Sequence, residues 1–476
     1  MRRSSGCGRP GRARFNTSLL IQKGDGLMDV RPGPAGDVEE KASPTRRLRL
    51  DLRTGLAAIG CFALLAWAYP SIVERFNRAA SDAKILRVGK TTERRKAVRE
   101  LAVIGLKNPE AAVEPLCKAL AEDKDPIVRQ ESARSLGAIV EKSSRAGSAP
   151  PWFSTIRTTL TTALDDPDPS TREAAASRLG VFGPLFTDDS PRLIRALAED
   201  ESPEVRTASA YSLGRYKGAS QQAIVQLLKG MDDPVRSVAS ACSESLSGLT
   251  ASVESIPDLI VAVDKGSAEK KVRAAGLLGR IGPDAIDAVP ALIAVLKTSP
   301  PDLFREAEAT GRTWDPVWSC AEALGRIAPK SKRSGEVVRS LAELLASDRR
   351  ERVSAAAQAL IPFGNEAASA VPALVSALKQ TFIPPRTGEG GAALAVALGE
   401  IAPGSSKADE AIAVLVVGLK ANDEFAIVRA TTALGRFGPK ARSAIPNLQA
   451  LLTHVSLPIR VEAARALTAI EDKAAR

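Results

Sequence analysis

The stretch LGRIGPDAIDAVPALIAVL, from Leu278 to Leu296, decides the fold because it holds a helix end, a turn and a second helix. Gly282 and Pro283 predict the end of the first helix, since glycine can adopt the left-handed conformation there and proline cannot continue the helix. The next apolar residues fall at the i, i+3, i+4 and i+7 positions of one helical face: Val289, Leu292, Ile293 and Leu296. The stretch therefore predicts two antiparallel helices joined by a short turn.

The same two-part pattern recurs from about Glu93 to the end of the chain. Its first part ends in LGRIGP, LGRIAP, LGEIAP or LGRFGP, and its second part opens with an aliphatic residue and proline, as in VPAL and IPNL. One aliphatic position, the marker residue, identifies each unit: Ile104, Leu136, Leu179, Leu213, Leu246, Leu278, Leu324, Leu360, Leu398, Leu434 and Leu467. These eleven units have a mean spacing of about 36 residues, which is typical of helical solenoid repeats.

A single helix pair of this size cannot bury its apolar faces, whereas pairs stacked side by side can. The sequence therefore predicts an all-α fold, an α-α superhelix of about eleven helix pairs over residues 93–472. Because each unit contacts only its neighbours, a chain of 476 residues does not need one large compact core.

These units resemble HEAT repeats, and the short alanine-rich ones are most similar to the phycobilisome-lyase-type HEAT group. The resemblance includes a D-P-x-x-R start at Asp125–Arg129 and Asp168–Arg172, with a shorter D-P-V-R at Asp233–Arg236. It implies that aspartates and arginines at these positions link neighbouring repeats in a ladder. The units at Leu360 and Leu467 depart from the pattern because they lack the glycine that follows the marker residue.

The net charge of +11 is confined to the first hundred residues. Residues 1–53 carry a net charge of +6, residues 54–73 carry none, and residues 74–100 carry +5, so residues 101–476 sum to zero. Nucleic-acid binding needs a dense row of cations facing phosphates. No nucleic acid is therefore expected as a partner, and a nucleic-acid-binding solenoid is only the third alternative.

The N-terminal part divides into three segments. Residues 1–53 are rich in arginine, glycine, proline and serine, and are predicted to be a disordered basic tail. Residues 54–73 are twenty uncharged residues, long enough to span a bilayer as a helix. Residues 74–92 form a basic collar at the start of the solenoid. The expectation is a single-pass membrane protein, with the membrane as a partner through residues 54–73.

Two alternatives to a membrane anchor remain open. A secretory signal could be cleaved after Ala66-Trp67-Ala68, and the segment could instead be a buried helix. Five lysines and arginines lie within twenty residues on each side of it, so the positive-inside rule does not predict on which side of the membrane the solenoid lies.

Few residues can support catalysis or metal binding. His454 is the single histidine, and the five cysteines are far apart: Cys7, Cys61, Cys117, Cys242 and Cys320. Cys117, Cys242 and Cys320 fall at small core positions of their units, which favours inert packing over reactivity. The G-x-G-x-x-A match at Gly388–Ala393 follows two prolines and not a central strand. We therefore expect no catalytic residues, no metal, no cofactor and no small-molecule substrate.

Insertions interrupt the repeat at residues 141–152, 299–316 and 381–391. Aromatic residues gather at or beside them, and solvent-reachable tryptophan is enriched at interaction hot spots. The candidate partner-binding residues are Trp152, Phe304, Trp314, Trp318 and Phe382. The alternative is that these rings only pin loops onto the solenoid.

The sequence as a whole predicts a membrane-tethered scaffold that binds another protein through its solenoid surface, and not an enzyme. A bilin-lyase-like or other HEAT-fold enzyme is the first alternative, on the resemblance alone.

Overall fold

The computed structural model describes residues 77–144, 150–183, 191–216, 220–298, 315–381, 390–421 and 423–472. All of them belong to one compact unit, Ala68–Arg476. The predicted disordered tail, residues 1–53, and the predicted transmembrane segment, residues 54–73, lie outside the described residues. Every regular element in the described ranges is a helix, so the predicted all-α solenoid is confirmed.

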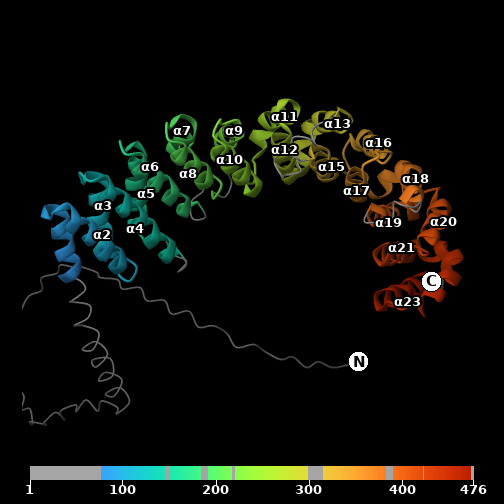
Figure 1. Cartoon of the computed structure of the whole chain (residues 1–476). Helices are drawn as coiled ribbons and strands as arrows, with labels where there is room; N and C mark the ends of the chain where they lie inside the picture. The colour runs from blue at the N-terminus through green and yellow to red at the C-terminus, as the bar shows by residue number, and fades with distance from the viewer. Residues whose placement is uncertain are drawn as a thin grey trace, which may run out of the picture. The chain divides into compact units, whose positions relative to one another are not determined.

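One row of helices lies on the inner side of the curved stack (Figure 1). We call it the inner row, and each of its members holds one of the marker residues. All eleven marker residues are buried, so the first helix of every predicted unit is confirmed, and within the described residues the first ten of these helices are followed by an outer helix. The inner row consists of α2 (Thr91–Gly105), α4 (Pro126–Ser144), α6 (Pro169–Leu179), α8 (Pro203–Leu213), α10 (Arg236–Gly248), α12 (Ala268–Ile281), α15 (Pro316–Ile327), α17 (Arg350–Leu360), α19 (Gly390–Ile401), α21 (Glu424–Phe437) and α23 (Leu457–Asp472).

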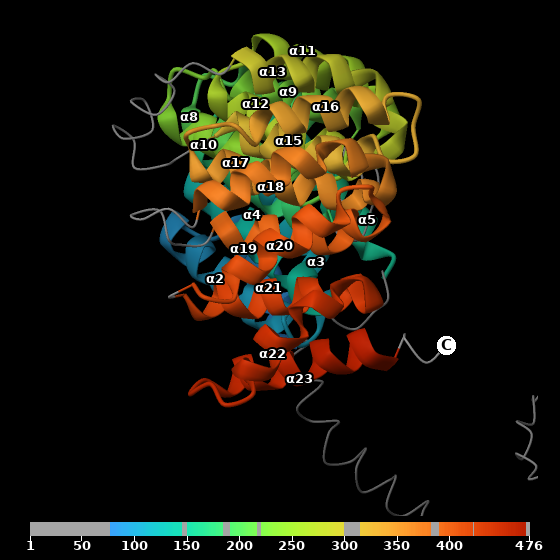
Figure 2. The same cartoon turned by 90° about the vertical axis from the view of Figure 1, so that its right-hand side faces the viewer.

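The second helix of each pair lies in an outer row, and the pairs follow one another down the stack when it is turned (Figure 2). The outer row consists of α3 (Pro109–Glu122), α5 (Trp152–Thr162), α7 (Pro191–Glu199), α9 (Gln221–Gly230), α11 (Ile256–Lys265), α13 (Val289–Thr298), α16 (Ser334–Leu344), α18 (Val371–Thr381), α20 (Ala408–Gly418) and α22 (Ile445–Leu451). Short 3₁₀ helices connect several pairs: η1 (Ala163–Asp165), η2 (Gly180–Phe182), η3 (Val253–Ser255), η4 (Gly282–Ala288), η5 (Ile361–Ala370), η6 (Ala402–Gly404) and η7 (Gly438–Ala444).

The glycine after the marker residue lets neighbouring inner helices approach closely. A Cβ atom added at Gly399 would lie 2.9 Å from the Cα atom of Ala433 on the next inner helix, and one at Gly435 would lie 3.1 Å from that of Ala466. Real Cβ atoms essentially never show the first distance, and the second is tighter than nine in ten real Cβ contacts. The Leu-Gly step of the sequence therefore reflects the packing of one unit against the next.

The turn after the first helix of a unit also needs glycine, although not in the conformation predicted. Gly282 has φ of +77° and Gly438 has φ of +55°, but their ψ angles are −140° and −137°. These ψ values are extended and do not belong to the left-handed helical region. The reason is the proline that follows each glycine, because a residue before proline avoids helical ψ values.

The ladder implied by the HEAT resemblance is present, with a different register. Arg129 on α4 donates to both carboxylate oxygens of Asp166, at 2.7 and 2.8 Å. Asp166 precedes α6 by three residues and also accepts from the backbone N–H of Asp168 at 2.9 Å. Asp168, the aspartate of the D-P-x-x-R motif, instead caps α6 by accepting from the Thr171 N–H. The ladder aspartate thus lies six residues before the arginine of its own unit, and not four.

Four such links join consecutive inner helices from α2 to α10. Both partners of each link are largely buried, and each arginine makes a bidentate contact. The links are Arg94–Asp123, Arg129–Asp166, Arg172–Asp200 and Arg206–Asp233. These hydrogen bonds raise the pKa of each arginine and, for Arg206, lower the pKa of its partner Asp233.

No helix within the described ranges is both long and apolar enough to cross a membrane. This finding contradicts the predicted single-pass membrane location, and membrane tethering is not retained. The physical reason is that each helix of the stack is amphipathic and keeps a polar face, whereas a spanning helix needs ~20 mostly apolar residues in succession. The longest described helix, α4, has 19 residues but carries several charged side chains.

Candidate partner-binding surface

Of the five aromatic residues singled out in the sequence, the structure describes Trp152 and Trp318. Phe304, Trp314 and Phe382 lie outside the described residues. Trp152 is half-buried at the start of α5, and its ring meets that of Phe153 edge-on at 4.7 Å between centroids. Trp318 on α15 is 36% exposed. The structure therefore uses Trp152 to anchor an outer helix and leaves Trp318 accessible.

Trp318 lies in a groove that crosses four consecutive helices of the inner row. This C-terminal groove encloses about 820 Å³ and is bounded by α15, α17, α19 and α21. Its lining combines the indole with small or aliphatic side chains and with polar side chains. The lining residues are Trp318, Arg350, Glu351, Ser354, Gln358, Ile361, Ala392, Ala393, Val396 and Arg429.

The margins of the C-terminal groove carry two exposed guanidinium groups, Arg350 on α17 and Arg429 on α21. Within the described part of the chain, neither forms an ion pair. Glu351 is the single carboxylate of the lining, so the groove has a net positive charge. An exposed indole next to a guanidinium and a small apolar floor is the composition of an interaction hot spot.

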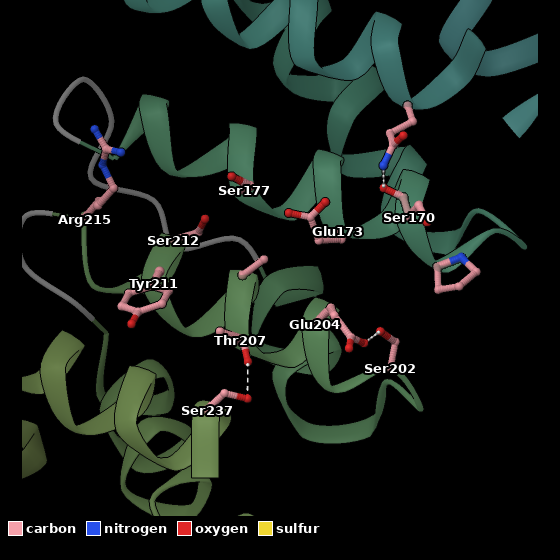
Figure 3. A pocket seen from close by; sticks show the side chains of 13 residues that line it. Ser170, Glu173, Ser177, Ser202, Glu204, Thr207, Tyr211, Ser212, Arg215 and Ser237 are labelled. Atoms are coloured by element: carbon pink, nitrogen blue, oxygen red, sulfur yellow. Dashed lines mark hydrogen bonds between the residues drawn. The ribbon is translucent and has the colours of Figure 1, made fainter. Parts of the chain in front are cut away.

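A second groove of about 600 Å³ crosses α4, α6, α8 and α10 on the same row. Figure 3 shows that hydroxyl groups and carboxylates line this N-terminal groove, with Tyr211 on α8 beside them. Its polar groups are bonded to one another: the Ser202 hydroxyl donates to Glu204 at 2.6 Å, and the Gln130 amide donates to the Ser170 carbonyl at 3.4 Å. The N-terminal groove is therefore lined by hydroxyls and carboxylates, whereas the C-terminal groove has an indole and two guanidinium groups in its lining.

Both grooves use the same positions of the repeat. Trp318, Ser354 and Ala392 each lie six residues before the marker residue of their unit, and so do Glu173 and Thr207 in the N-terminal groove. Gln358 and Tyr211 each lie two residues before theirs. These two columns face away from the core on the inner row. Sequence analysis found Trp318 but missed Ser354 and Ala392, which a comparison of equivalent repeat positions would have revealed.

Other cations on the inner row are paired with carboxylates of the next helix. Arg99 on α2 contacts Glu131 on α4 at 3.1 Å, and Arg134 on α4 contacts Glu173 on α6 at 3.5 Å. Arg436 on α21 pairs with Glu400 on α19. Positive and negative groups therefore alternate along these parts of the row.

The three described cysteines are buried, and the histidine is engaged in a loop hydrogen bond. Burial raises the pKa of Cys117 to about 11 and that of Cys242 to about 12, and it also raises the pKa of Cys320. His454 occupies the ladder-aspartate position of its unit, where its Nδ1 accepts from the Ser456 N–H at 3.1 Å. In the part of the chain that the structure describes, no group of three or more His, Cys, Asp or Glu residues is arranged to hold a metal ion.

Comparison with known sequences identifies the repeat type. The family model for HEAT repeats matches residues 83–149 and 156–247. No sequence among the curated proteins is similar enough to this chain to be counted as a relative. The phycobilisome-lyase-type resemblance gains no support from these comparisons.

Solved structures show the same architecture. The structure in which Kap95p binds RanGDP matches with a TM-score of 0.51 at 13% identity, over 83% of this chain and 57% of the other. Two Kap121p structures, one of a mutant form and one bound to the extreme C-terminus of the phosphatase Cdc14p, have a TM-score of 0.49 at 14% and 15% identity. The match to the mutant form covers 89% of this chain and 51% of the Kap121p chain, and the match to the Cdc14p-bound form covers 90% and 53%. The chain thus spans little more than half the length of these proteins. Residues 83–149 and 156–247 thus match HEAT repeats in sequence, and the helical stack continues beyond them to α23.

Proposed function

We propose that this protein is a scaffold that binds another protein through the inner row, with the C-terminal groove as the principal contact. The observation that carries the proposal is the 36% exposed Trp318 in a groove of about 820 Å³. The two arginines at the margins of this groove form no ion pair with any described residue. An exposed indole gains more from burial against a partner than most other residue types at an interface.

The geometry of the groove favours a protein over a nucleic acid. Nucleic-acid binding draws on a continuous row of cations, whereas Arg99, Arg134 and Arg436 are each neutralised by a neighbouring helix. An apolar floor with an aromatic ring instead suits apolar side chains. Kap95p, which has a similar fold, binds RanGDP, so a stack of this kind can hold a protein partner.

The proposed role requires no reaction. The carboxylates of the N-terminal groove are held by partners, as in the contacts of Glu173 with Arg134 and of Glu204 with Ser202. Cys117 and Cys242 are buried with raised pKa values, and the His454 ring takes part in a loop hydrogen bond. These groups are engaged in the fold, which supports binding as the function and not catalysis.

Site-specific photo-crosslinking of the full chain in its source cells tests this proposal. A photoreactive p-benzoylphenylalanine replaces Ser354 in the groove or, as the matched control, Arg339 on the outer helix α16. We expect the Ser354 probe to crosslink a discrete protein that the Arg339 probe does not reach, and Trp318→Ala to reduce that crosslink about tenfold. Equal crosslinking from both positions, or no effect of Trp318→Ala, would contradict the proposal.

A further inference from the structure

We infer that the segment bound in the C-terminal groove is an extended, acidic stretch of the partner protein with an apolar side chain at its centre. The inference rests on the proposed function and specifies the chemistry of the partner. It follows from the direction of the groove, the charges at its margins and the character of its floor.

The direction of the groove favours an extended segment. Its lining comes from four consecutive inner helices, α15, α17, α19 and α21. Packed helices lie about 8–10 Å apart, so a ligand that follows the groove crosses three such steps, roughly 24–30 Å. An extended chain advances about 3.3 Å per residue. About eight residues in extended form therefore fill the groove, whereas a helix of the same length would reach less than half as far.

The charges at the margins favour carboxylates. Arg350 on α17 and Arg429 on α21 are two helices apart along the row, and each is exposed. Arginine binds carboxylate in a bidentate manner, and this chain uses that geometry in its own ladder, as between Arg172 and Asp200. Because Glu351 is the single acid of the lining, at least one guanidinium is available to an acidic partner residue.

The floor between the two arginines favours an apolar side chain. The half-buried Ile361 and Val396 line the groove together with Ala392 and Ala393 from α19. Ala392 and Ala393 are small, so they occupy little of the groove that they line together with Trp318. An aromatic or large aliphatic side chain suits such a lining. An acidic residue on each side of one large apolar residue therefore matches the groove from end to end.

Defined peptides and the full chain provide the test. The probe is a fluorescein-labelled nine-residue peptide with alternating glutamate and proline around a central phenylalanine, where the prolines keep the chain extended. Two matched peptides carry lysine in place of every glutamate, or alanine in place of the phenylalanine. Fluorescence anisotropy measures the dissociation constant of each peptide.

We expect the glutamate peptide to bind at least about tenfold more tightly than the lysine and alanine peptides. Arg350→Glu/Arg429→Glu should reverse the charge preference. The milder Arg350→Gln/Arg429→Gln should abolish it. Arg339→Glu/Arg442→Glu, which makes the same charge change at exposed positions outside the groove, should leave the dissociation constants within about twofold.

Each other outcome overturns the inference in an identifiable way. Equal binding of the glutamate and lysine peptides, or no binding up to about 1 mM, would refute an acidic segment. If Trp318→Ala still weakens the crosslink from Ser354 in that case, the scaffold function stands and only the chemistry of the partner is wrong. If Trp318→Ala affects neither peptide nor crosslink, both proposals fall.

Discussion

The stack from α2 to α10 and the stack from α12 to α23 are built from the same helix pair but joined by different interactions. In the first, four buried arginine–aspartate links tie each inner helix to the next. In the second, glycines and alanines bring the inner helices together, as at Gly399–Ala433. One ion pair at a different repeat position, Arg352–Asp315, joins α17 to α15 at 3.3 Å. Close packing at the glycine after the marker residue is common to both stacks, as at Gly214–Ser245 and Gly399–Ala433, whereas the four ladder links join only the inner helices of the first stack.

The residues that distinguish the two halves occupy one position of the repeat. Seven residues before the marker residue, α4, α6 and α8 have arginine, whereas α15, α17 and α21 have Val317, Val353 and Ile427. In the second half only the last helix, α23, has arginine there, Arg460, which donates to the His454 carbonyl. An apolar side chain at this position needs no aspartate in the following loop as a partner. After α22, His454 occupies the loop position that holds the ladder aspartate in other units. The HEAT family model matches only the half that has the ladder, up to residue 247.

Removal of one ladder aspartate should be the most damaging single change. Asp166→Ala leaves the largely buried Arg129 unpaired and also removes the bond to the Asp168 N–H, so we expect a loss of about 3 kcal/mol in unfolding free energy. Hydrogen-exchange mass spectrometry should place the lost protection in α4 and α6, because repeats unfold locally. The control Asp348→Ala, an exposed loop aspartate before α17, should cost less than about 0.5 kcal/mol.

A bulky residue at a close-approach glycine should damage the C-terminal half by about 2 kcal/mol. In Gly399→Val the new side chain meets the backbone of Ala433, so α19 and α21 must separate. Chemical denaturation followed by hydrogen exchange measures the effect. Gly276→Val in α12 is the matched control, since the nearest atom to its added Cβ is a flexible arginine tip at 3.9 Å. Equal losses in the two variants would refute the packing explanation.

Acid should weaken the N-terminal half first, because the link between α8 and α10 depends on an ionised carboxylate. The hydrogen bond from Arg206 holds the pKa of Asp233 below its ordinary value of 3.8. A carboxyl group whose pKa is lower in the folded state stabilises the fold at pH values above 3.8, the ordinary pKa. This contribution disappears as the pH falls through the lower folded-state pKa. Pepsin digestion at decreasing pH should therefore cut between α4 and α10 before it cuts between α15 and α21. Earlier cutting between α15 and α21 would contradict the assignment of acid sensitivity to the N-terminal half.

Cysteine labelling should give the smallest effect. Cys117, Cys242 and Cys320 are buried and have raised pKa values, so iodoacetamide at neutral pH should leave all three unmodified in the native protein. In the Asp166→Ala variant, local opening should increase the labelling of Cys117 on α3 but not that of Cys320 on α15. Peptide mass spectrometry reads each site separately.

Much of the fold could be predicted because the apolar residues that form its core recur periodically in the sequence. The marker residues recur at nearly constant spacing and all of them are buried, so one rule found every unit. The motif residues Arg129, Arg172 and Asp233 do link neighbouring units, but the sequence alone does not distinguish Asp166 from Asp168 as the partner of Arg129. Only the structure shows that the second caps its own helix while the first reaches Arg129.

The site was less predictable, since it combines single residues from different units. Trp318 was found because tryptophan is rare in this chain, whereas Arg350 and Arg429 are two among many charged residues. Their common location becomes visible only when the inner helices are placed side by side. Whether an arginine lies at the groove or elsewhere on the solvated surface depends on how the helices pack, and the repeat spacing alone does not encode this.

Hydrogen-exchange mass spectrometry of the full chain with and without the glutamate peptide tests the central claim most directly. We predict slower exchange in α15, α17, α19 and α21 when the peptide is bound, with little change in the outer row or from α2 to α10. Protection confined to outer-row helices such as α16 and α18, or to the N-terminal half, would contradict the assignment of the C-terminal groove as the binding site.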